Sequence, residues 1–123
     1  MAKPIMIIED DAVERNRLSI LLNLKGFEVC PLNHSYRFLT EVAKCNPDLI
    51  LLDSVLTEID STLVALTLRS LDTVRNIPLV LIAGKDYENY TYAYNTPEKA
   101  NLEELKTADI YSLIKDIELK MAG

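Results

Sequence analysis

The stretch "PIMIIEDDAVER", residues 4–15, joins a continuous apolar run directly to a cluster of acids. Residues 4–8 have no polar side chain, a pattern typical of a strand buried on both faces of a sheet. Glu9, Asp10 and Asp11 follow at once. Grouped carboxylates repel one another, so they either bind protons more tightly or need a cation between them. The stretch therefore predicts a buried strand that ends in a charged site.

Apolar strands and helical stretches alternate along the chain as far as residue 83. Strands that are connected through helices can pair in parallel, because each helix carries the chain back to the start of the next strand. These connections are right-handed crossovers. The pattern predicts a doubly wound α/β domain with helices on both faces of the sheet. The expected strands are residues 4–8, 27–32, 48–53 and 77–83, and the expected helices are residues 11–25, 35–45 and 60–74.

The pattern is weaker after residue 83. The aromatic and Thr-rich stretch "YTYAYNT", residues 90–96, favours a fifth strand. Apolar residues at helical spacing predict a final helix over residues 97–121, with a break near 107–109. The segment between Ala83 and Thr96 is too short for a helix, a strand and two loops. We therefore expect the fourth helix to be shortened or absent.

Composition limits the class of protein. The chain has 123 residues, 49% hydrophobic and 26% charged, which indicates one globular domain over residues 1–123 without an output domain. A net charge of -6 argues against binding to nucleic acid or to an anionic membrane surface. No apolar run is long enough to span a membrane, and the N-terminus lacks a signal-peptide pattern, so the expected location is the cytoplasm.

Two cysteines and one histidine are the other chemically notable residues. The spacing of Cys30 and Cys45 matches no zinc or redox motif, and we expect both to be small buried hydrophobic residues. His34 has no neighbouring metal-ligating residue, so we expect it at a helix start or on the surface rather than in a catalytic role.

Acids end two of the predicted strands. Glu9, Asp10 and Asp11 follow the first, and Asp53 ends the third. Open parallel sheets bind ligands at the carboxyl ends of their strands, where the strand order reverses. If the two strands are neighbours, the acids converge, and a set of carboxylates suits Mg²⁺. Alternatively, such acids cap the following helix, and this role is expected for Asp11 in particular.

The segments "PIMIIEDDAVERNRLSILLNLKGFEV", "PDLILLD" and "IPLVLIA" together resemble the receiver domain of two-component response regulators, over residues 3–83. The resemblance implies a flavodoxin-like, five-stranded parallel sheet in the order 2-1-3-4-5. It also implies that Asp53 is the phosphoacceptor. Glu9 and Asp10 would hold Mg²⁺, Asp10 directly and Glu9 through water, and Val55 would offer its backbone carbonyl to the metal.

The same resemblance implies a role in a phosphorelay. A histidine kinase or phosphotransfer protein would donate the phosphoryl group, and a downstream signalling protein would respond through protein–protein contact. The chain would not be an enzyme beyond assisting its own phosphorylation and dephosphorylation. A homodimer and a monomer are both compatible with the sequence.

The sequence departs from the family pattern at several positions. Ala83 stands where the fourth strand normally ends in Thr or Ser, so the hydroxyl that binds the phosphoryl group is missing. Lys99 is our first choice for the lysine that contacts the phosphoryl group, and Lys85 is an alternative. Thr57 and Ser61 replace the usual Pro and Gly, a change that we expect to alter the stiffness of the loop rather than its chemistry.

Two other interpretations remain open. A pseudo-receiver would keep the fold but act as a phosphorylation-independent interaction module, an interpretation favoured by Ala83. An unrelated flavodoxin-like binder of a nucleotide or flavin would need a Gly-rich phosphate loop after the first strand, where this chain has acids.

Overall fold

The computed structural model describes residues 4–83, 89–93, 106–107, 115 and 119, and the statements below concern these residues. They build one six-stranded sheet in the order β2-β1-β3-β4-β5-β6. Within this part of the chain, no helix has the length and apolar character needed to cross a bilayer. The elements are β1 (Pro4–Ile8), α1 (Ala12–Leu24), β2 (Glu28–Pro31), the 3₁₀ turn η1 (Ser35–Arg37), α2 (Phe38–Cys45), β3 (Leu49–Asp53), α3 (Ser61–Ser70), β4 (Leu79–Ala83), β5 (Asn89–Ala93) and β6 (Lys106–Thr107).

The first four strands pair in parallel, as predicted. β1 lies between β2 and β3, so the strand order reverses at β1 and the two acid-bearing strands are neighbours. Ile8 pairs with Leu52, so the residue after β1 and the last residue of β3 lie side by side at the carboxyl edge. This register places the functional site.

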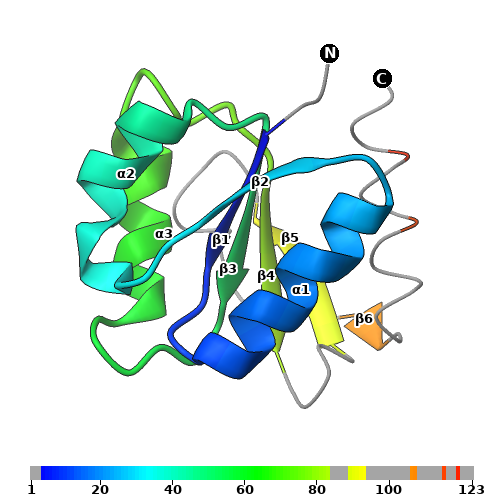
Figure 1. Ribbon diagram of the computed structural model, residues 1–123. Helices are drawn as coiled ribbons and strands as arrows, with labels where there is room; N and C mark the ends of the chain where they lie inside the picture. Colours follow the sequence, from blue (N-terminus) through cyan, green and yellow to red (C-terminus); the bar gives the residue numbers. More distant parts are fainter. Residues whose placement is uncertain (1–3, 84–88, 94–105, 108–114, 116–118, 120–123) are drawn as a thin grey trace.

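Side chains of the central strands alternate between two hydrophobic layers. Ile5 and Ile7 pack with residues of α1, whereas Met6 and Ile8 pack with residues of α2 and α3. Figure 1 shows α1 on one face of the sheet and α2 with α3 on the other. Burial on both faces explains why these strands are apolar throughout instead of alternating in polarity.

The predicted parallel fifth strand is wrong in its direction. β5 pairs antiparallel with β4, and Leu79 lies opposite Ala93. A parallel neighbour needs a crossover of about a dozen residues or more, and only residues 84–88 connect the two strands. The expectation of a shortened fourth helix falls on residues 84–88, which lie outside the described residues.

The prediction of one helix over residues 97–121 is also wrong. Lys106 and Thr107 form β6, which pairs antiparallel with β5 at the edge of the sheet. An unpaired edge strand presents free backbone groups, and this short strand satisfies part of that edge. Lys115 and Leu119 are helical, while the rest of the predicted helix lies outside the described residues.

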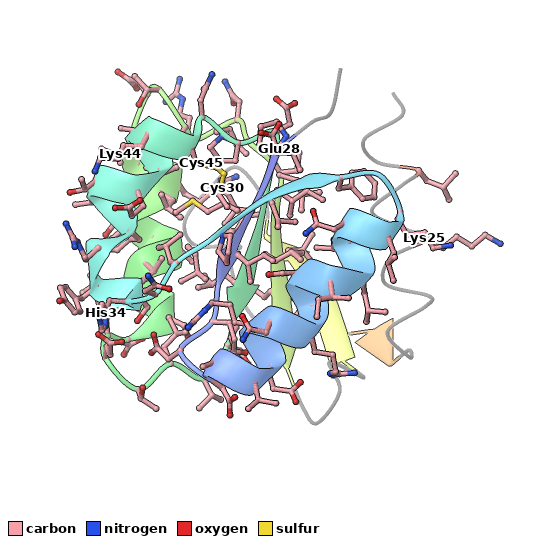
Figure 2. All side chains as sticks on the ribbon, in the orientation of Figure 1. Lys25, Glu28, Cys30, His34, Lys44 and Cys45 are labelled. Carbon is pink, nitrogen blue, oxygen red and sulfur yellow. A yellow bond between two sulfur atoms is a disulfide. The ribbon has the colours of Figure 1, made fainter. Side chains whose placement is uncertain are left out.

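Cys30 and Cys45 form a disulfide, contrary to the expectation that they are small buried hydrophobic residues. Cys30 lies in β2 and Cys45 is the last residue of α2, with their Cα atoms 6.2 Å apart and both side chains partly buried. Figure 2 shows the bond between the two sulfur atoms at the end of α2. Because the pairing depends on how α2 packs beside β2, cysteine spacing alone did not predict it.

Candidate functional site

Glu9 and Asp53 meet at the carboxyl edge of the sheet. Each follows a buried apolar strand segment, and the parallel register of β1 and β3 brings them together. Glu9 is almost fully buried, with 3% of its surface exposed, and its side chain is hydrogen-bonded to the Asp53 carboxyl group. The predicted convergence of acids from two strands is therefore present for this pair.

The environment of Asp53 favours its protonated form. Burial is the largest cause, followed by the hydrogen bond with the Glu9 side chain, and together with the nearby charges of Glu9 and Asp10 they raise the pKa of Asp53 to about 8. The backbone N–H of Val55 donates to Asp53 Oδ1 at 3.0 Å and acts in the opposite direction. This environment therefore favours a proton on Asp53 when no cation is present to balance the charge of the two carboxyl groups.

Asp10 turns to a different set of partners. Its Oδ2 accepts hydrogen bonds from Ser35 Oγ at 3.0 Å, from the Thr57 N–H at 2.8 Å and from Thr57 Oγ1 at 3.2 Å. The Glu58 N–H also donates to Oδ2 at 3.1 Å, and the Ser35 N–H donates to Oδ1 at 3.2 Å. Asp10 thus joins the turn before α2 to the loop before α3.

These hydrogen bonds keep Asp10 ionised. Partial burial alone would raise the pKa of its carboxyl group, but the bonds from Ser35, Thr57 and Glu58 outweigh it and lower the pKa below its ordinary value. Among the described residues, no three His, Cys, Asp or Glu side chains are gathered in an arrangement that holds a metal ion. Asp10 is therefore not assembled with Glu9 and Asp53, and its direct contact with Mg²⁺ stays a prediction.

Asp11 caps the following helix, as the alternative interpretation expected. Its Oδ1 accepts hydrogen bonds from the N–H groups of Val13 at 2.9 Å and Glu14 at 3.1 Å. The Asp11 N–H in turn donates to Glu9 Oε1 at 2.9 Å. Asp11 therefore stabilises the start of α1 and helps to fix the buried Glu9 side chain.

Of the remaining predicted site residues, the structure describes two and leaves two outside the described residues. Val55 follows β3 in an exposed loop, and Ala83 is the last residue of β4. The Ser54 N–H donates to the Ile82 carbonyl at 2.8 Å, so the ends of β3 and β4 stay together. Lys85 and Lys99, the two candidates for the lysine that contacts the phosphoryl group, lie outside the described residues.

Sequence reasoning missed Ser35, Thr57 and Glu58 as partners of Asp10. We expect the replacement of proline by Thr57 to alter the stiffness of its loop, and the structure adds a contact that this expectation did not include, since Thr57 donates two hydrogen bonds to Asp10. The signal was available in the resemblance, since proline at this position has neither an N–H nor a hydroxyl group.

His34 adds a second link between the same two loops. It immediately precedes η1, as the expectation of a helix-start role required, and its Nδ1 lies 3.2 Å from Glu58 Oε1. The His34 ring also contacts the Tyr36 ring, with 5.3 Å between centroids. Figure 2 shows His34 at the opposite end of the η1–α2 segment from Cys45.

Comparison with protein families gives a match over most of the chain. The model described as "Response regulator receiver domain" matches residues 5–115. The DNA-binding response regulator MtrA of Mycobacterium tuberculosis is 32% identical over 85 residues, which are 69% of this chain and 36% of MtrA. The chain thus matches about a third of the length of that relative. The polar-differentiation response regulator DivK of Brucella anthropi is 29% identical over 84 residues, 68% of each chain.

Solved structures show the same fold. The signal receiver domain of a DNA-binding response regulator from Colwellia psychrerythraea aligns with a TM-score of 0.76, covering 98% of this chain and 99% of that one at 18% identity. A CheY-like receiver domain from Methylobacillus flagellatus aligns with a TM-score of 0.71, covering 97% and 98% at 19% identity. At these identities, the likeness establishes the flavodoxin-like α/β fold.

Proposed function

The chain belongs to the response regulator receiver domain family of two-component signalling, and we propose that it accepts a phosphoryl group on Asp53 with the help of Mg²⁺. The observation that carries this proposal is the contact between Asp53 and the buried Glu9 at the carboxyl edge of β1 and β3. Burying two carboxyl groups against each other is costly unless a proton or a cation compensates them. A structural role alone does not account for that cost.

The donor chemistry of the site fits a hard divalent cation. Glu9, Asp10 and Asp53 supply carboxylate oxygens, and Val55 supplies a backbone carbonyl, which are the ligand types that Mg²⁺ prefers. Within this set, Asp53 and Glu9 are already in contact, whereas Asp10 has to leave hydrogen bonds to its loops. When bound, the cation would screen the repulsion between the carboxylate and the incoming phosphoryl oxygens.

The proposed reaction is a phosphoryl transfer from a histidine of a partner protein. A carboxylate oxygen of Asp53 forms the new bond to phosphorus, while the phosphorus–nitrogen bond breaks and its electron pair leaves with the imidazole. The proton that burial and Glu9 favour on Asp53 must pass to the solvent first, because the attacking group is the carboxylate, and the leaving imidazole takes up a proton from the solvent so that it departs neutral. The Val55 N–H, which donates to Asp53 Oδ1, helps to orient the carboxylate for this step.

The proposed partners are proteins. A histidine kinase or phosphotransfer protein donates the phosphoryl group, and a downstream signalling protein recognises the domain. The chain is a phosphoacceptor and not an enzyme that turns over a separate substrate. DNA binding is a property of MtrA as a whole protein, of which the match covers 36%, and the net charge of -6 gives this domain no reason to share it.

A pseudo-receiver is the second candidate function. Two observations favour it: Ala83 ends β4 without a hydroxyl group, and Asp10 is bound by loop donors instead of joining Glu9 and Asp53. In this case the domain would bind its partner without phosphorylation.

Phosphorylation by a small-molecule donor distinguishes the two candidates. The protein is incubated with phosphoramidate, with Mg²⁺ or with EDTA, and its intact mass is measured. We expect one added phosphoryl group that requires Mg²⁺ and disappears in Asp53→Asn. The matched control is Asp72→Asn, since the Asp72 side chain is 91% exposed and lies away from the site. An unmodified wild-type mass, under conditions that modify an ordinary receiver, would support the pseudo-receiver.

A further inference from the structure

We propose that Ser35 and Thr57 are positioning residues that hold Asp10 in a tie between two loops, and that Mg²⁺ binding must open this tie. The inference rests on the proposed function, because it uses the same cation site. It adds a route by which the loaded site communicates with the rest of the domain. The tie consists of Asp10, Ser35, Thr57 and the Glu58 N–H.

The Asp10 carboxylate is held by five hydrogen bonds, most of them on one oxygen. An ionised carboxylate offers about four acceptor positions. Asp10 accepts two hydrogen bonds from Ser35, two from Thr57 and one from Glu58, all between 2.8 and 3.2 Å. Four of these bonds fall on Oδ2 and one on Oδ1, and they hold the side chain apart from a shared metal site, because no three acidic side chains of the described residues are gathered to hold a metal ion. To coordinate a cation together with Glu9 and Asp53, Asp10 therefore has to turn and lose at least one of these bonds. The cation and the tie therefore compete for the same side chain.

The tie depends on side chains that the general family pattern lacks. The usual proline at position 57 could donate neither the N–H bond nor the hydroxyl bond that Thr57 donates. Ser35 is fully buried and uses both its N–H and its hydroxyl group on Asp10. The His34–Glu58 contact lies in the same two loops and strengthens their connection.

Opening the tie would act on elements that lead away from the site. Ser35 begins η1, which continues directly into α2, and Thr57 lies in the loop that leads to the capping residue of α3, Asp60. Both helices cover the same face of the sheet (Figure 1). Ala83, on the other side of Asp53, has no hydroxyl with which to sense a phosphoryl group. The change would therefore reach the surface through α2 and α3.

A Mg²⁺ titration followed by two-dimensional amide NMR tests this coupling in the wild-type protein. The Val55 amide, which contacts Asp53, reports on cation binding at the site. The Ser35, Thr57 and Glu58 amides report on the tie. We expect their amide proton signals to move upfield as their bonds to Asp10 are lost, over the same range of Mg²⁺ concentration in which the Val55 signal shifts. If Val55 shifts and the tie amides stay fixed, the cation binds without opening the tie and the inference is wrong. If none of them shifts, the cation site itself fails, and the tie as a switch fails with it.

Variants measure the competition directly. Thr57→Val removes one hydroxyl donor from an exposed residue, and Thr57→Val with Ser35→Ala removes two. We expect the double variant to bind Mg²⁺ roughly tenfold more tightly, since bonds to a charged acceptor no longer oppose the cation. Thr67→Val is the matched control, because the Thr67 hydroxyl bonds to Leu63 within α3. Unchanged or weaker binding in both variants, with melting temperatures near that of the wild type, would overturn the proposal.

Discussion

At the scale of single residues, the contact between Glu9 and Asp53 has consequences for stability. In the folded protein the pKa of Asp53 is raised to about 8 from its ordinary value of 3.8, so between these two pH values the folded state holds a proton that the unfolded state releases. This contribution to stability is fully present below pH 3.8 and is lost as the pH rises through 8. The metal-free protein should therefore lose stability across this window.

Asp53→Asn removes this pH dependence. In EDTA at pH 8.5, we expect the variant to be more stable than the wild type by on the order of 2 kcal/mol, a value reduced for the hydration that the half-buried carboxyl group retains. At pH 5 the difference should shrink, because wild-type Asp53 is then protonated. Urea unfolding at both pH values measures this difference in the free energy of unfolding. A wild type as stable as the variant at pH 8.5 would show that Asp53 is not paired with Glu9 as described.

Residue-level prediction worked where a residue follows a strand. Glu9 and Asp53 were found because acids after buried apolar runs are conspicuous, and the neighbouring strands bring them together. Ser35 and Thr57 were missed because their partner, Asp10, is 25 and 47 residues away, and common hydroxyl residues in loops carry no periodic signal. The replacement of proline by Thr57 was noticed, but its meaning depended on where Asp10 points.

At the scale of elements, the Cys30–Cys45 disulfide joins α2 to the edge strand β2. The linked residues are 15 positions apart, and closing a loop of this length stabilises a fold by about 3 kcal/mol in the chain-entropy account. Reduction should therefore lower the urea midpoint of the wild type. Cys30→Ser with Cys45→Ser should show the lower midpoint without reductant and no further change when reductant is added.

The control for this prediction is the count of free thiols in the unreduced, denatured protein. We expect none from the joined pair before reduction and two afterwards. Two free thiols before reduction, together with a midpoint that does not respond to reductant, would contradict the assignment of the disulfide.

The element-level prediction failed where local pattern and chain length pointed in different directions. Aromatic and Thr-rich residues correctly indicated a strand near residue 90, but local propensity says nothing of strand direction. The short connection over residues 84–88 decides the direction, because a parallel pairing needs a longer crossover. Apolar spacing over residues 97–121 likewise suggested one helix, whereas edge pairing with β5 makes Lys106 and Thr107 a strand.

At the scale of the whole molecule, the two hydrophobic layers explain why the parallel part of the sheet and its helices could be predicted from the sequence. The central strands β1 and β3 are buried on both faces, so they are apolar throughout, and the helices between them are amphipathic. Parallel pairing in the order β2-β1-β3-β4 follows from this pattern together with the crossover rule. The site then lies where the order reverses, at the carboxyl edge of β1 and β3.

This arrangement leads to one central claim, that Asp53 is the residue of this receiver domain that carries the phosphoryl group. The most direct test is chemical mapping of the modified residue. Borohydride reduces an aspartyl phosphate to homoserine, so the protein is treated with phosphoramidate and Mg²⁺, reduced, digested and sequenced by mass spectrometry. We predict homoserine at position 53, dependent on Mg²⁺. Homoserine at another acid, or at no position in a protein that binds Mg²⁺, would contradict the claim.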